Sequence, residues 1–156
     1  MIEEQAGWVG KWAIKVIDSK TRKVKEETVI KNRLMNTALD EMAKVLLGQS
    51  TDMEIKYLAL GTGSTAITDT DTTLATEIFR TADQSLTDTG TGEVTSLFIV
   101  LDSEAVAAIE EIGVFGGTTA TASADSGTLI SRILWSRNKT NSEEIQFTRV
   151  DTIGRG

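Results

Sequence analysis

The sequence predicts an α+β fold that is mainly antiparallel β-sheet, sandwich-like, with one amphipathic helix and one short helix. Three observations lead to this class. Apolar and polar residues alternate over several short segments, as half-buried strands require. Threonine, which favours strands, occurs 23 times in the 156 residues. One longer segment has the apolar spacing of an amphipathic helix.

The first predicted strands form a two-stranded hairpin from residue 8 to residue 30. Even-numbered residues such as Trp12 point to one side and lysines point to the other, as a pleated strand requires. A hairpin alone is too small to bury Trp8 and Trp12, so we expect them to pack on the rest of the domain or on another chain. We therefore distinguish an N-terminal β-hairpin over residues 1–31, a candidate for partner docking, from a compact β-rich domain over residues 32–156.

A long amphipathic helix is predicted after the hairpin. Its apolar residues recur at the i, i+3, i+4, i+7 and i+8 spacing that gathers them on one face. They are Leu39, Met42, Ala43, Leu46 and Leu47. Asn36 or Thr37 is placed to cap the first amide groups, and Gly48 is placed to end the helix in the left-handed conformation.

Beyond this helix the chain is predicted to return to strands. Residues 55–60 indicate a buried strand, and residues 61–71 form a loop of Gly, Ser, Thr and Asp. Asp71 or Thr72 then caps a short helix. The apolar residues of that helix are Leu74, Ile78 and Phe79. The remaining predicted strands cover residues 79–86, 94–101, 109–115, 129–135 and 145–150, with loops at 87–92 and 116–127.

The chain contains no His, Cys or Pro, which removes whole classes of chemistry. Nucleophile relays with His, thiolate chemistry, disulfides and His- or Cys-ligated zinc all need one of these side chains. Gly61 and Gly63 lack the spacing of a phosphate-binding loop, and Asp69 and Asp71 do not match a calcium-binding loop. Nothing in the sequence near the candidate catalytic amines suggests a lowered pKa. These amines are Lys44, Lys56 and Lys139. We predict no enzyme activity and no catalytic, cofactor or metal site.

Charge is distributed unevenly along the chain, whose net charge is −7. Residues 51–127 carry thirteen acidic and two basic residues, whereas the segments on either side carry a small basic excess. An acidic middle repels phosphate backbones, so nucleic-acid binding is disfavoured. No apolar run approaches the roughly 20 residues of a membrane helix, and the first ten residues lack a secretion signal. We expect a protein made in a cytoplasm that binds neither nucleic acid nor membrane.

Four short motifs, in order, resemble a known family. They are Leu58-Ala59-Leu60-Gly61-Thr62-Gly63, Thr73-Leu74-Ala75-Thr76-Glu77-Ile78-Phe79-Arg80, Ile109-Glu110-Glu111-Ile112-Gly113-Val114-Phe115 and Gly127-Thr128-Leu129-Ile130-Ser131-Arg132. The matching family patterns are "ALGTG", "T-x-L-x-x-E-x-x-R", "I-x-E-I-G-L-F" and "G-x-L-I-A". In these motifs the chain is similar to the N-terminal domain of bacteriophage tail-collar fibres and to its short phage and prophage relatives. The similarity spans about residues 32 to 136.

The resemblance implies a virion structural protein that joins tail or baseplate to fibre, commonly as a homotrimer. It makes Glu77 and Arg80 the acid and base of the short helix, and Glu111 the acid of the following strand motif. We expect these residues to have structural roles, with Arg80 pairing a carboxylate beneath the 61–71 loop. Trp8 and Trp12 precede the matched region and are candidates for insertion into a neighbour. No fibre shaft or receptor-binding tip follows in the sequence, so direct host recognition is not expected.

The predicted function is therefore docking without catalysis in the tail, baseplate or collar of a phage or phage-like particle, with the chain itself and other virion proteins as partners. Two alternatives remain open. One is a capsid decoration or cement protein. The other is a carbohydrate-binding or hydrolytic tail module, in which Trp135 or Tyr57 stacks on sugar rings.

Overall fold

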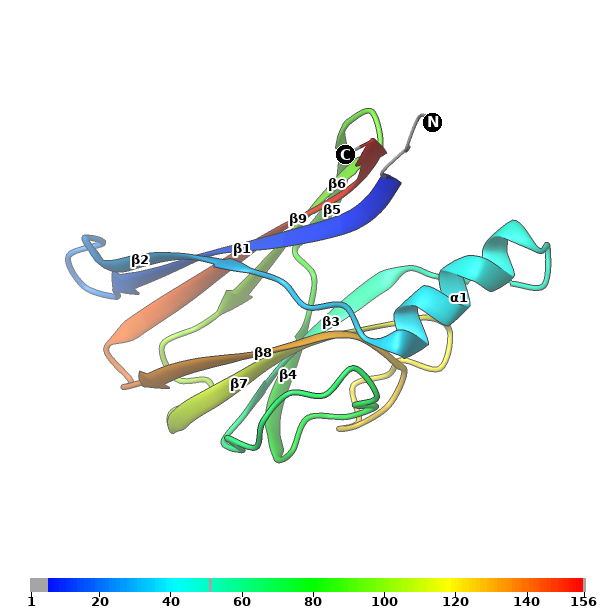
Figure 1. Ribbon diagram of the computed structural model, residues 1–156. Helices are drawn as coiled ribbons and strands as arrows, with labels where there is room; N and C mark the ends of the chain where they lie inside the picture. The colour runs from blue at the N-terminus through cyan, green and yellow to red at the C-terminus, as the bar shows by residue number, and fades with distance from the viewer. Residues whose placement is uncertain (1–5, 51, 156) are drawn as a thin grey trace.

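The computed structural model describes residues 6–50 and 52–155, which form two antiparallel sheets packed face to face (Figure 1). The larger sheet has the strand order β2-β1-β9-β6-β5, and the smaller sheet has the order β4-β3-β7-β8. The strands are β1 (Ala6–Asp18), β2 (Val24–Lys31), β3 (Ile55–Gly61), β4 (Glu77–Ala82), β5 (Ser85–Gly90), β6 (Glu93–Val100), β7 (Ala108–Gly116), β8 (Thr128–Asn138) and β9 (Glu143–Arg155). This architecture confirms the predicted sandwich-like, mainly antiparallel fold.

The main core lies between the two sheets. Most strands contribute alternate residues to it, as the period-two pleat requires, whereas β5 is exposed at every position. The fully buried contributors from the larger sheet include Trp12, Ile14, Val16, Phe98, Val100, Ile145 and Phe147, and those from the smaller sheet include Leu58, Leu60, Ile109, Ile112, Val114 and Ile130. A second, smaller apolar cluster lies on the other face of the smaller sheet. Its members are Met35, Ala59, Leu74, Phe115 and Leu129.

The predicted N-terminal hairpin is part of the larger sheet. β1 pairs with β2 on one side and with β9 along its whole length on the other, from Ala6 opposite Arg155 to Asp18 opposite Glu143. The residues of β1 that face inward belong to the main core. The hairpin and the strands after residue 31 therefore share one core.

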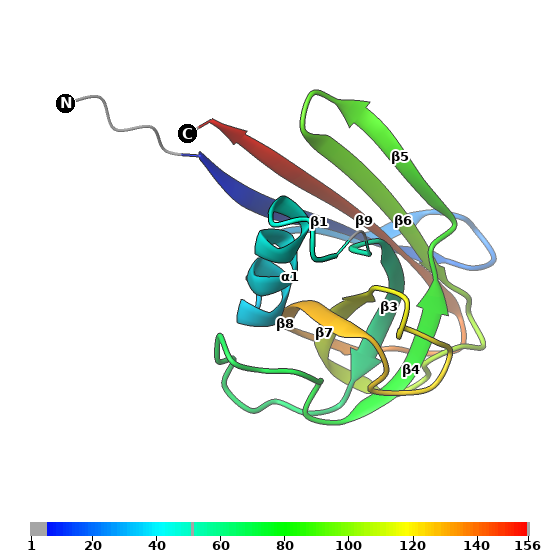
Figure 2. The same ribbon diagram turned by 90° about the vertical axis from the view of Figure 1, so that its right-hand side faces the viewer.

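Helix α1 (Asn36–Leu46) lies where the apolar spacing predicts a helix and ends before Gly48 as predicted, but the start of the helix differs from the prediction. The N-cap residue is Met35, and no side chain caps the first turn. Gly48 follows the helix with a φ of 70°, which is the left-handed conformation that glycine adopts readily. The helix contacts β8 (Figure 2).

The short helix predicted through Leu74 and Ile78 is wrong. Residues 62–76 form an irregular loop on the outer face of the smaller sheet, where Leu74 belongs to the second cluster. The strand β4 begins at Glu77 and pairs with β3. The predicted strand over residues 79–86 is two strands, because the chain leaves the smaller sheet after β4 and enters the larger sheet at β5.

Candidate functional site

The charged residues singled out in the sequence gather on the outer face of the smaller sheet. A bulge in β4 first brings Glu77 and Arg80 together. Gly61 of β3 pairs with Glu77, and a register shift leaves Ile78 as the extra residue. Residues three apart on a regular strand face opposite sides, whereas one extra residue returns both to the same side. Arg80 then donates to both carboxylate oxygens of Glu77, at 2.7 and 2.8 Å, and both side chains are buried.

Arg80 also holds the loop between β7 and β8. Its Nη1 donates to the carbonyl oxygen of Thr121 at 2.9 Å and to that of Ser126 at 3.1 Å. Its guanidinium carbon lies 4.4 Å from the ring centroid of Phe115 and 5.5 Å from that of Tyr57, within cation–π distance. The predicted pairing of Arg80 with a carboxylate is present, but the loop it fixes is the 117–127 loop.

Glu111, on β7, anchors the loop over residues 62–76. Its carboxylate accepts hydrogen bonds from the backbone N–H of Gly63 at 3.1 Å, Ala75 at 2.9 Å and Thr76 at 2.8 Å. A Cβ atom on Gly63 would lie 2.7 Å from Oε1 of Glu111, and one on Gly61 would be closer still. The two glycines of the Gly-Thr-Gly sequence therefore allow the backbone to approach this carboxylate.

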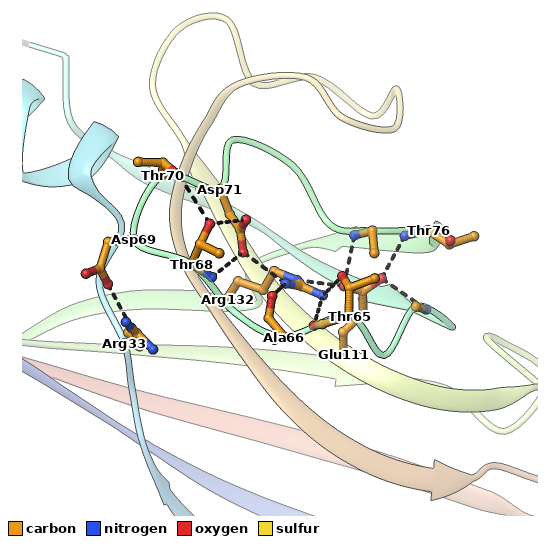
Figure 3. Close-up of polar contacts among 12 residues, drawn as sticks. Arg33, Thr65, Ala66, Thr68, Asp69, Thr70, Asp71, Thr76, Glu111 and Arg132 are labelled. Carbon is orange, nitrogen blue, oxygen red and sulfur yellow. Dashed lines mark hydrogen bonds and ion pairs between the residues drawn. The ribbon is translucent and has the colours of Figure 1, made fainter.

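Arg132, on β8, completes the anchor from the adjacent strand. Its Nε donates to Oε2 of Glu111 at 2.7 Å, and its Nη1 donates to Oδ2 of Asp71 at 2.9 Å. The other donors reach the carbonyl oxygens of Thr65 and Ala66, at 3.0 and 3.5 Å, and the Thr65 hydroxyl at 3.1 Å. All five guanidinium N–H groups thus have acceptors. Figure 3 shows this buried arginine between Glu111 and the loop.

Asp71 is held in the ionised form at the edge of this anchor. Burial opposes its charge, but hydrogen bonds from the amide and hydroxyl of Thr68 and the nearby Arg132 outweigh burial and lower its pKa below the usual 3.8. Asp69 accepts from Arg33 at 2.8 Å in an exposed pair (Figure 3). Exposed pairs of this kind contribute little stability.

The two N-terminal tryptophans lie between the sheets. Trp12 is fully buried, and its ring meets Phe147 edge to face at 6.1 Å. Trp8 is partly buried, and its Nε1 donates to Oδ1 of Asp151 at 2.8 Å. The same carboxylate pairs with Arg149, whose guanidinium lies 5.4 Å from the Trp12 ring. Trp12 therefore packs within its own chain, and insertion of Trp12 into a neighbour is ruled out by its burial.

A further charged cluster lies at the start of β9. Glu143 is fully buried and accepts from Arg137 at 2.6 Å, Lys25 at 3.2 Å and the amide of Thr140 at 3.0 Å. Burial opposes the ionised form, but these bonds outweigh it and lower the pKa of Glu143 from 4.5 to about 2.

Lys139 is also buried, and its Nζ donates to three backbone carbonyl oxygens. They belong to Leu101, Asp102 and Thr140, at 3.0, 3.0 and 3.3 Å. Burial lowers the pKa of this amine below 10.5. Leu101 and Asp102 lie far from Lys139 in the sequence, so the sequence does not reveal that this side chain is buried. With all three N–H donors occupied, Lys139 acts as a structural cation.

Several sequence interpretations change with this geometry. Glu77 and Arg80 interact, but on a strand and not on a short helix. Trp135 is 7% exposed and packs against Phe147 at 5.9 Å, so it is not available to stack on a sugar. Arg132 was missed, although a lone arginine within the apolar strand segment 129–135 is itself a signal of a buried ion pair.

The buried carboxylates follow one pattern, because each accepts a charge-assisted hydrogen bond from an arginine. The pairs are Glu77–Arg80, Glu111–Arg132, Glu143–Arg137 and Asp151–Arg149. Among residues 6–50 and 52–155, no group of three or more acidic side chains is placed to hold a metal ion. The arrangement fixes loops and strand ends in single conformations and leaves these charged groups engaged with protein atoms.

Comparison of the chain with protein-family models, curated proteins and solved structures gives no match. The described part of the chain also contains no helix with the length and apolar character needed to cross a membrane.

Proposed function

We propose that this protein is a non-catalytic structural component of a phage or phage-like particle, which joins tail, baseplate or collar to fibres by docking with copies of itself and with other virion proteins. The observation that carries this proposal is the exposed apolar stripe of α1. Leu46 is 85% exposed and Leu39 48%, and Leu47, the residue directly after the helix, is 69% exposed. An amphipathic stripe normally faces a core, so an exposed one favours a binding surface for protein.

The charged clusters support a structural role over a chemical one. General acid–base and nucleophilic catalysis need a group that can reach substrate. Glu77 and Glu111 instead hold arginines and backbone amides on the outer face of the smaller sheet. The amine of Lys139 donates its hydrogen bonds to backbone carbonyl oxygens. Rigid loops on a sandwich suit a module that presents a fixed shape to its neighbours.

Size-exclusion chromatography with light scattering, followed by particle imaging, tests the proposal. We expect a mass that is a multiple of 16.9 kDa, with three copies as the first expectation. Purified protein should bind tail, baseplate or fibre proteins of the particle, and antibody labelling should place it there. A strictly monomeric protein without affinity for any virion protein would contradict the proposal. Label over the capsid shell would instead identify a decoration protein, and release of reducing sugar from a glycan would identify an enzyme.

A further inference from the structure

A groove lies at one end of the sandwich, beside the exposed stripe of α1. We call it the end groove, and its apolar walls are Trp8, Met42, Met53, Leu86, Val94 and Ile153. Figure 2 shows α1 between β8 and the paired ends of β1 and β9, and residues of all four elements line the groove. Met42 belongs to both features, because it lies on the helix and lines the groove.

Only part of the apolar face of α1 is buried against the rest of the chain. Ala38 is its buried residue, and the hydroxyl of Thr37 donates to the carbonyl oxygen of Leu129 in β8 at 2.8 Å. Leu39 and Leu46 lie three residues before and four residues after Met42, on the same face. The exposed stripe therefore continues from the helix surface, across Met42, into the end groove.

The chemistry of the groove favours an apolar side chain as its occupant. Asp151 lines the groove, but its carboxylate already accepts from Trp8 and twice from Arg149. Glu54 also lines the groove, and the remaining lining residues are apolar or glycine. The volume is about 170 Å³, which is below the roughly 300–1,000 Å³ of small-molecule pockets. The groove is thus suited to one or a few inserted aliphatic side chains.

The combined area matches what an interface between two copies needs. Seven apolar side chains here are more than a third exposed, and they are Leu39, Val45, Leu46, Leu47, Leu86, Val94 and Ile153. Together they offer on the order of 700 Å², more than the roughly 300–600 Å² of the largest patch on a typical monomer and close to the about 800 Å² each partner buries in a standard interface.

We infer that a second copy of this chain covers this surface, with the α1 stripe of one copy packed into the end groove of the next. Each copy carries both a projecting apolar helix face and an apolar groove, so two copies supply each other with the missing partner. The inference rests on the proposed function and assigns the surface through which self-docking occurs.

Cross-linking tests the contact directly, because the chain has no cysteine. Leu46→Cys chains and size-tagged Ile153→Cys chains are mixed and mildly oxidised. We expect a disulfide between unlike chains. The matched control mixes Leu46→Cys with Val29→Cys, since Val29 is 70% exposed on the outer face of the larger sheet, away from the groove. A yield no higher than that of the control would overturn the inference.

Substitution separates this inference from the proposed function. Leu46→Glu should raise the dissociation constant of the oligomer by on the order of 100-fold, while Val29→Glu leaves it unchanged. Circular dichroism should show both variants folded, because both side chains are exposed. An oligomer that survives Leu46→Glu would overturn the assigned surface and leave the proposed function standing. A monomeric wild-type chain would overturn the inference and assign the surface to a partner of different sequence.

Discussion

Arg132 Nε donates to Glu111 Oε2 at 2.7 Å, and both side chains are buried beneath the 62–76 loop. The two residues come from adjacent strands of the smaller sheet, and each binds a different set of backbone groups in the loop. Glu111 accepts from amides near both ends of the loop, and Arg132 donates to carbonyls in its first half. One ion pair thus satisfies opposite kinds of backbone group, which explains how a long loop without regular structure packs closely on a sheet.

Removing the arginine of this pair should cost stability. Arg132→Leu leaves the Glu111 charge buried without its partner, and we expect the free energy of unfolding to fall by about 3–5 kcal/mol. Urea unfolding monitored by tryptophan fluorescence measures the change. Arg33→Leu, which breaks an exposed pair with Asp69, should change it by less than about 1 kcal/mol. Equal effects of the two substitutions would contradict the anchoring role.

The glycine at position 63 should not tolerate a side chain. In Gly63→Ala the new Cβ would approach both Ala75 and Glu111 within 3 Å, so the loop or the carboxylate must move. We expect a loss of about 1–3 kcal/mol, measured by thermal unfolding. Gly7→Ala is the matched control, because nothing lies within 4 Å of its added Cβ. A Gly63→Ala variant as stable as Gly7→Ala would show that the close approach is unimportant.

Stability should fall in acid through Glu143. Its pKa is about 2 in the folded protein and 4.5 without the fold, so the ionised side chain stabilises the fold above pH 4.5. This contribution, up to about 3 kcal/mol, disappears as the pH falls from 4.5 to 2. Urea unfolding at pH 6 and pH 3 should show a smaller pH dependence for Glu143→Gln than for wild type. Glu27→Gln, at an exposed site, should keep the wild-type dependence.

Arg80 should control the 117–127 loop without controlling the whole fold. Arg80→Ala removes the donors to the Thr121 and Ser126 carbonyls and the contact with Phe115. Amide hydrogen exchange in this loop should speed up at least tenfold, which is on the scale of one lost charge-assisted bond, with little change in the strands of the larger sheet. Arg22→Ala, which breaks a partly exposed pair with Glu144, should leave exchange in the loop unchanged.

The alternation of apolar residues predicted the sandwich class and most strands correctly. A strand with one buried face needs an apolar residue at every second position, and this pattern is visible in the sequence. The prediction of a short helix was wrong because Leu74 and Ile78, although four residues apart, do not lie on one helix face. Leu74 packs in the second cluster from a loop, and Ile78 is the exposed extra residue of a bulge. Spacing alone does not distinguish these cases.

The site was predictable in part. The pairing of Arg80 with an acid was expected, but its bond to Glu77 depends on a bulge that no local pattern reveals. The pairing of Glu111 with Arg132 depends on the register of β7 against β8, which is fixed by the whole sheet. The burial of Trp135, by contrast, could have been predicted from the apolar strand in which it lies.

The pairing of Ala6 with Arg155 has a practical consequence. These two positions are neighbours at one end of β1 and β9, two residues from Trp8 and Ile153 of the end groove. A tag attached through either residue would therefore leave the molecule at the same place. A short bridge from residue 155 to residue 6 would turn the chain into a closed circle with its strands undisturbed.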